Sequence, residues 1–204
     1  MQYPIPKELI VFEEEIKKSR FITYLQHTEG LSEAKAFLHQ IREQHPNARH
    51  HCWAAVALQP NNSQALGFSD DGEPSGTAGK PMLNCLLGSG IGEISAVVVR
   101  YYGGVLLGTG GLVRAYSNGV QQALKLLETT IKVERKLYRL FCDYHQINWI
   151  QNLCETFDIV IHAQEFQEKV KFELGISDVK LAPFKKILIE GSSGQLNLQS
   201  LEIE

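Results

Sequence analysis

The chain has 204 residues, of which 44% are hydrophobic and 21% charged, and its formal net charge is −3. This balance is typical of one large or two small globular domains, and no apolar stretch approaches the length of a membrane span. Lys and Arg nearly balance Asp and Glu in both halves of the chain. The composition therefore excludes a nonspecific nucleic-acid binder with a general basic excess, and any RNA contact needs a local patch.

The cysteines and the N-terminus indicate the compartment. None of the four cysteines belongs to a CxxC pair, so the paired ligands of a zinc site are absent. Their pattern predicts reduced, mostly buried thiols. The opening MQYPIPKELI lacks the features of a signal peptide. We therefore expect a cytoplasmic protein with no metal, no cofactor and no membrane partner.

The uneven distribution of glycine indicates a boundary within the chain. Most of the 17 glycines lie between Gly67 and Gly119, and residues 131–174 contain none. This shift predicts two domains, residues 1–130 and 131–204. The first half reads as ββαβ(β)αβα, with Ser32 as the N-cap of its first helix. Its expected strands are the two in residues 7–28 and those at 52–60, 65–68 and 93–102, and its expected helices are 31–45, 82–90 and 110–128.

The second half has the order βαββαβ. This order is the ferredoxin-like pattern, in which one face of the sheet is left open for a partner. Ser177 is the expected N-cap of the last helix, Gly191 its end, and Pro183 a perturbation in its middle. The expected strands are 131–144, 158–166, 169–176 and 196–204, and the helices are 145–158 and 177–191.

The stretch FSDDGEPSGTAGKP, residues 68–81, concentrates acids and glycines. The carboxylates of Asp70, Asp71 and Glu73 can bind Mg²⁺ or take a proton from water. Alternatively, they belong to a turn, because Asp-Gly favours turns and Asp side chains bond nearby backbone amides. The composition favours the turn.

The same stretch opens a helix. Ser75 and Thr77 can cap it, and Gly76 and Gly79 allow close approach of a ligand to the backbone. Lys80 adds a positive charge beside the free N–H groups, which suits an anion. The spacing is not that of a P-loop.

A second glycine-rich motif is RYYGGVLLGTGGLVRAYSNG, residues 100–119. A strand ends in two tyrosines, and GTGG leads into a helix that Thr109 can cap. Two arginines can pair with phosphate and the tyrosines can stack on bases. Alternatively, Arg100 pairs with one of the three acids and the tyrosines pack in the core. We expect both motifs to meet in one groove, with the nucleic-acid or anion-binding candidates Lys80, Arg100, Tyr101, Tyr102, Gly103, Gly104, Thr109, Gly110 and Arg114.

The motif ARHHCWAA, residues 48–55, begins a strand. Alternation places His50 and Cys52 on one face and His51 on the other. A Cys–His nucleophile pair is one interpretation. Packing, with histidine bonded to the backbone, is the favoured one, and no catalytic residue is assigned.

These three motifs together resemble the IMPACT family, and the resemblance covers the whole chain. It implies an α+β protein of two domains. The first is a ribosomal-protein-like βαβ domain similar to domain four of elongation factor G, and the second is similar to its domain five. Eukaryotic relatives restrain an amino-acid-starvation kinase through an additional N-terminal domain. We do not expect that mechanism in a chain of this length, and the family supplies no catalytic residue set.

The resemblance and the glycine motifs favour a non-enzymatic, translation-associated regulator that binds RNA or the ribosome through the glycine-loop groove, the sheet of the second domain, or both. One alternative is a hydrolase-type enzyme that uses Asp70, Asp71 and Glu73 on a phosphorylated or peptide substrate. Another is a protein–protein interaction regulator that uses the open sheet of the second domain. The sequence leaves the oligomeric state open.

Overall fold

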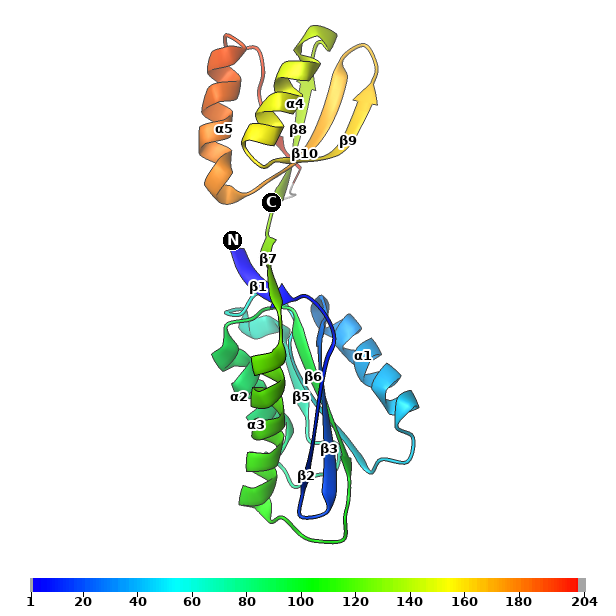
Figure 1. Cartoon of the computed structure of the whole chain (residues 1–204). Coiled ribbons are helices and arrows are strands. Elements are labelled where there is room, and N and C mark those ends of the chain that lie inside the picture. Colours follow the sequence, from blue (N-terminus) through cyan, green and yellow to red (C-terminus); the bar gives the residue numbers. More distant parts are fainter. Residues whose placement is uncertain (1, 202–204) are drawn as a thin grey trace. The chain divides into compact units, whose positions relative to one another are not determined.

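The computed structural model describes residues 2–201, and it is a mixed α+β protein with two compact units (Figure 1). One unit is Tyr3–Lys132, and the other is built mainly from Val133 onward. The predicted fold class, α+β in two domains, is confirmed. Within the described residues, no helix is long and apolar enough to cross a membrane.

The first unit is a five-stranded sheet, in the order β2-β3-β6-β4-β5, with helices on both faces (Figure 1). Neighbouring strands are antiparallel. A separate two-stranded sheet joins β1 to β7. The elements are β1 (Gln2–Pro6), β2 (Ile10–Ile16), β3 (Ser19–His27), α1 (Gly30–Gln44), β4 (His50–Val56), β5 (Leu66–Ser69), α2 (Gly79–Ser89), β6 (Ile94–Tyr101), α3 (Thr109–Leu126) and β7 (Thr129–Val133).

The central strand β6 explains the two-faced core. All but the last of its residues are buried, because both of its faces are covered. Ala96 and Val98 pack in the core beneath α2 and α3, whereas Val97 and Val99 pack in the core beneath α1. A strand buried on both faces needs no polar alternation, which is why ISAVVV is continuously apolar.

Two sequence expectations for this unit need correction. Helix α1 begins at Gly30, with Glu29 as N-cap, so Ser32 lies inside the helix. The side chain of Glu33 accepts a hydrogen bond from the backbone N–H of Glu29 instead. Strand β1 was not predicted, and it contains two prolines, which argue against a central strand. They are tolerated here because, among the described strands, β1 pairs with β7 alone and so has an unpaired edge.

The second unit has the βαββαβ order that the sequence predicts, and its sheet order is β11-β8-β10-β9. The predicted strand 131–144 is divided between β7 and β8. Pro183 lies inside α5 without ending it. The predicted strand 196–204 is two residues long in the described part, and residues 202–204 lie outside it. The elements are β8 (Lys136–Cys142), α4 (Ile147–Thr156), β9 (Val160–Phe166), β10 (Val170–Ile176), α5 (Asp178–Gly191) and β11 (Gln199–Ser200).

Candidate functional site

Both glycine-rich motifs lie at one end of the five-stranded sheet, which we call the glycine-loop end. Strand pairing places Arg20 opposite Tyr101 and His50 opposite Arg100. The start of β3, the end of β6 and the start of β4 therefore lie side by side. The turn between β2 and β3 and the starts of α2 and α3 lie at this same end.

A cavity of about 390 Å³ at this end is lined by both motifs, and we call it the glycine-loop cavity. The expectation that the two loops form one groove is confirmed. The lining comes from the first loop, from the second loop with the start of α3, and from the sheet and the residue before it. The lining residues are Arg49, His50, Glu73, Pro74, Arg100, Tyr102, Leu106, Leu107, Gly108, Thr109 and Leu112.

Asp70 caps helix α2 from outside the helix. Its carboxylate accepts hydrogen bonds from the backbone N–H groups of Gly76, Ala78 and Gly79 at 2.8–3.0 Å. Burial acts to raise the pKa of Asp70, but these three bonds outweigh it, and its pKa lies below the usual value. Asp70 therefore places a negative charge from the chain itself at the N-terminus of α2.

The predicted caps of α2 do not act as caps. The hydroxyl of Thr77 donates to the carbonyl oxygen of Pro74 at 2.6 Å, and Ser75 is exposed. A Cβ atom on Gly79 would lie 2.7 Å from the backbone carbon of Ser69. The glycine thus permits close packing of α2 against β5 and does not serve the approach of a ligand.

The other two acids bond to separate partners. Asp71 accepts hydrogen bonds from the backbone N–H of His51 at 2.7 Å and from Arg42 at 2.5 Å. One oxygen of Glu73 accepts from Arg100 and from Tyr116, both at 2.7 Å. The three acids do not converge, and residues 2–201 contain no cluster of three or more His, Cys, Asp or Glu side chains that can hold a metal. The turn interpretation is therefore supported over the metal or general-base one.

Arg100 is held inside the wall of the cavity. Its guanidinium lies over the rings of Phe21 and Tyr102, at 5.4 and 5.5 Å from their centroids, and donates to Glu73 and to Ser19. Only 5% of the residue is exposed. The structure therefore supports the alternative in which Arg100 pairs with an acid, and among the described residues its Nε has no hydrogen-bond partner.

The two tyrosines have different surroundings. The hydroxyl of Tyr101 is hydrogen-bonded to Nδ1 of His45 at 2.8 Å, and Nε2 of the same ring is bonded to Tyr24 at 2.6 Å. Burial lowers the pKa of His45. Tyr101 is thus part of an internal network, which contradicts its predicted stacking role. Tyr102 lines the cavity and is 43% exposed, so its ring remains available.

Gly103 lets the end of β6 cross the turn between β2 and β3. A Cβ atom there would overlap the backbone carbonyl of Lys18, and the N–H of Gly103 donates to Ser19 at 3.2 Å. Gly104 has φ +84°, in the left-handed region that glycine favours. These two glycines shape the chain where it turns toward α3.

The histidines and the cysteine of the third motif are structural. His50 bonds through Nδ1 to the carbonyl oxygen of Asp71, and His51 bonds through Nε2 to that of His45. Burial lowers the pKa of His51. The thiol of Cys52 is fully buried and donates to the carbonyl oxygen of Asp70, and burial raises its pKa far above the usual value. A Cys–His nucleophile pair is therefore contradicted.

Helix α3 begins without a side-chain cap from any of the described residues. Its N-cap is Gly108, at φ +73°, so Thr109 is the first helical residue and not the predicted cap. Within the described residues, no group accepts a hydrogen bond from the N–H of Thr109, Gly110 or Gly111. A Cβ atom on Gly110 would meet nothing within 4 Å. The start of α3 is thus an open set of donors with the positive end of the helix dipole behind it.

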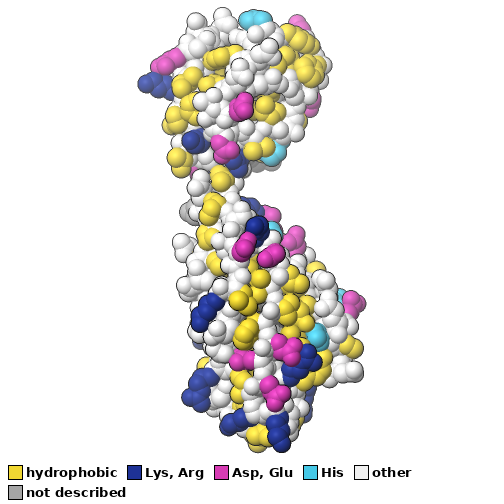
Figure 2. Space-filling model, viewed as in Figure 1, with side chains coloured by type: hydrophobic (Ala, Val, Ile, Leu, Met, Phe, Trp, Pro, Cys, Tyr) yellow, Lys and Arg dark blue, Asp and Glu magenta, His cyan; other side chains and the backbone are white. Residues whose placement is uncertain are grey.

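Five exposed cations at the glycine-loop end have no ion-pair or hydrogen-bond partner in residues 2–201. Lys80 and Arg114 were predicted as site residues, whereas Lys17, Lys18 and Arg49 were missed. The signal that sequence analysis overlooked was the KK pair at the hairpin turn. Figure 2 shows Lys and Arg side chains at the lower end of the first unit, where Figure 1 places the β2–β3 turn and the start of α3.

Arg114 lies outside the glycine-loop cavity. It lines a second hollow, of about 600 Å³, with Lys17, and the lining of this hollow contains no acidic residue. The predicted pair of Arg100 and Arg114 on a single ligand is therefore not seen. Lys17 and Arg114 instead form a basic surface between the hairpin and α3.

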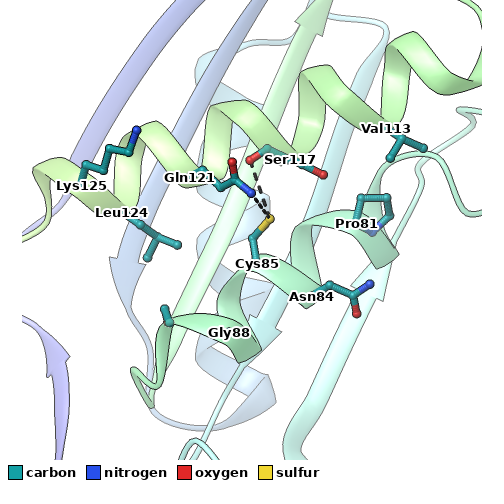
Figure 3. A pocket seen from close by; sticks show the side chains of 10 residues that line it. Pro81, Asn84, Cys85, Gly88, Val113, Ser117, Gln121, Leu124 and Lys125 are labelled. Atoms are coloured by element: carbon teal, nitrogen blue, oxygen red, sulfur yellow. Dashed lines mark hydrogen bonds between the residues drawn. The ribbon is translucent and has the colours of Figure 1, made fainter.

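A third hollow, of about 730 Å³, lies between α2 and α3 (Figure 3). The thiol of Cys85 donates to the carbonyl oxygen of Ser117, and Gln121 donates to the sulfur. Burial raises the pKa of the Cys85 thiol. Most of the side chains that line this hollow are uncharged, and Lys125 lies at its rim.

Comparisons with known families agree with this geometry. Residues 17–124 match the model of the Impact N-terminal domain, which contains both glycine-rich motifs. Residues 140–195 match a domain of unknown function, DUF1949.

Similar proteins extend over nearly the whole chain. An IMPACT family member of Haemophilus influenzae is 65% identical, over 99% of this chain and 98% of the relative. The IMPACT family member YigZ of Escherichia coli is 54% identical, over 97% of both chains. A solved structure described as that of a hypothetical protein is 53% identical, with a TM-score of 0.77, and covers 100% of this chain and 98% of its own.

Proposed function

The chain belongs to the IMPACT family, and on this premise we propose that it is a non-enzymatic, translation-associated regulator that binds RNA or the ribosome through its glycine-loop end. One observation carries the proposal. Five exposed cations at this end have no partner among the described residues, while Asp70, Asp71 and Glu73 are bonded internally. The five are Lys17, Lys18, Arg49, Lys80 and Arg114.

A local basic surface can attract a polyanion although the chain as a whole is acidic. The three acids of the first loop are already bonded to Arg42, Arg100 and the backbone N–H groups of α2, so they oppose a polyanion less than free carboxylates would. Exposed Lys and Arg side chains release counterions when they contact phosphates, and this supports sequence-independent binding. The half-exposed ring of Tyr102 adds a surface on which a base can stack.

The internal bonds of the acids favour binding over hydrolysis. A hydrolase would need a free carboxylate or an ionisable thiol, but Asp70 caps α2 and Glu73 is buried against Arg100. The thiol of Cys52 is buried with a raised pKa. These groups stabilise the loop. The side chains that remain free to contact a ligand are the exposed cations.

The open sheet of the second unit is less suited to a polyanion. Lys171 lies 3.0 Å from Glu165 and 2.9 Å from Glu173, and Arg139 lies 3.8 Å from Glu173. These cations already have acidic partners on the same sheet. The glycine-loop end is therefore the favoured RNA surface.

Co-sedimentation with purified ribosomes and subunits, at low and moderate salt, tests the proposal. We expect salt-sensitive binding that weakens roughly tenfold or more when Lys17, Lys18 and Arg114 are all changed to Gln. The matched control changes three exposed lysines of the second unit, Lys180, Lys185 and Lys186, to Gln and should bind like wild type. Absence of binding at both salts, or equal losses in both variants, would overturn the proposal.

A further inference from the structure

We propose that the glycine-loop cavity binds the terminal phosphate of a ribonucleotide at the open start of α3. The phosphate site stands on the structure of the cavity. The assignment of the phosphate to a ribonucleotide rests on the proposed RNA-binding function.

The start of α3 supplies donors without an acceptor. Helix α3 has 18 residues, and the N–H groups of Thr109, Gly110 and Gly111 are bonded to nothing in the described part of the chain. Gly108 and Thr109 line the glycine-loop cavity. Free N–H groups together with the helix dipole favour an anion.

The start of α2, in the same unit, shows that a carboxylate can occupy the N-terminus of a helix here. At the start of α2, the carboxylate of Asp70 accepts three backbone N–H groups. No side chain in the described part of the chain takes that place at the start of α3, where Gly108, Gly110 and Gly111 provide no side-chain oxygen. Two helices thus begin at one end of the sheet, one with an internal anion and one open to a cavity.

Two arginines provide the independent evidence for an anion. Arg100 is 95% buried in the wall of this cavity, and its Nε has no hydrogen-bond partner within residues 2–201. Arg49 is exposed at the same cavity without a partner in residues 2–201. His50 also lines it and uses Nδ1 for the carbonyl oxygen of Asp71. Glu73 is the acidic residue of the lining, so the two positive charges of Arg49 and Arg100 exceed its single negative charge.

The rest of the lining favours a nucleotide over a bare phosphate. A volume of about 390 Å³ exceeds what a phosphate fills, and Tyr102 and Leu106 present exposed apolar surface, 43% and 81% exposed. Glu73 accepts both of its hydrogen bonds through Oε1. Its carboxylate would repel a second anion beside it but can accept a ribose hydroxyl. The arrangement therefore suits a phosphate at α3 and Arg49, a sugar toward Glu73 and a base against Tyr102.

Substitution of Gly110 by Asp tests the site directly. A side chain at residue 110 meets no neighbour, so an aspartate can place its own carboxylate at the start of α3, as Asp70 does at α2. The matched control is Gly110→Ala, which adds a side chain without charge. Thermal unfolding should show that both variants are folded.

The binding of four probes is measured by calorimetry. These are inorganic phosphate, adenosine 5′-monophosphate, phosphoserine, and one short RNA that carries a phosphate at its 5′ end, at its 3′ end or at neither. We expect the nucleotide and one phosphorylated form of the RNA to bind more tightly than inorganic phosphate. In Gly110→Asp this binding should weaken roughly tenfold or more, and Gly110→Ala should keep it. Preference for the free nucleotide over both RNA ends would assign the site to a small molecule and overturn the RNA-end assignment.

The outcomes separate this inference from the proposed function. If ribosomes still bind but Gly110→Asp leaves nucleotide binding unchanged, the cavity site is wrong and the basic surface stands. If phosphate and nucleotide bind but ribosomes do not, the anion site stands and its RNA assignment fails. Phosphoserine that binds as tightly as the nucleotide would overturn the nucleotide assignment.

Discussion

Nη1 of Arg100, at the end of β6, lies 2.7 Å from Oε1 of Glu73, in the loop before α2, and both side chains are buried. Tyr116 of α3 donates to the same oxygen at 2.7 Å. This carboxylate therefore joins a strand, a loop and a helix at the glycine-loop end. The buried pair fixes the wall of the cavity and holds the two glycine-rich loops together.

Breaking this pair should be costly. Glu73→Gln leaves the buried guanidinium of Arg100 without its counter-charge, and we expect a loss of about 3 kcal/mol in the free energy of unfolding. Glu13→Gln is the control, because it breaks the exposed ion pair with Arg20 and should cost less than about 1 kcal/mol. Urea unfolding measures both, and similar losses in the two variants would contradict the assigned role of the buried pair.

Asp70 should make stability depend on acid. Its pKa in the folded state lies below the unfolded value, near 4, so its contribution is present above about pH 4 and is lost as the pH falls through the folded pKa. Asp70→Asn removes the charge and replaces one of two acceptor oxygens with an NH2 donor, so it should cost about 1–2 kcal/mol at pH 7. The difference from wild type should shrink in urea unfolding below pH 4, and a difference that stays constant down to pH 2 would argue against the charged cap.

Gly103 should tolerate no side chain. A Cβ atom would overlap the backbone carbonyl of Lys18, so Gly103→Ala should lower the free energy of unfolding by about 1–3 kcal/mol. Gly88, an exposed residue of α2 with open space around it, is the control. Gly88→Ala should raise stability by up to about 1 kcal/mol because alanine favours helix. A neutral Gly103→Ala would show that the turn adjusts freely.

The four thiols should differ in reactivity. Cys52, Cys142 and Cys154 are at most 1% exposed, whereas Cys85 is partly exposed in the hollow between α2 and α3. A thiol-specific disulfide reagent should therefore modify one thiol quickly in the native protein and all four after unfolding. Cys85→Ser should remove the fast phase. A fast reaction of Cys52 would restore it as a candidate nucleophile.

Much of the architecture could be predicted because it depends on local chemistry. Apolar periodicity identified the buried face of α1, and continuous apolar residues identified β6. Gly90, in the left-handed conformation, is the C-cap of α2 and lies at the end of the predicted helix 82–90. Each of these features depends on residues a few positions apart. Strand β1 was missed because its partner, β7, lies more than a hundred residues away in the chain.

The candidate site also has features that depend on nearby residues and features that depend on residues far apart in the chain. The sequence predicted that two glycine-rich turns open helices, and its composition favoured a turn for Asp70. Which charges are paired became visible in the folded structure alone. Arg100 and Glu73 are 27 residues apart, and burial in one wall makes them partners, whereas Lys17, Arg49 and Arg114 come to the same end of the sheet and remain exposed. Chain spacing does not reveal such choices, because a charge pairs with the opposite charge that folding brings within reach in a place where water is excluded.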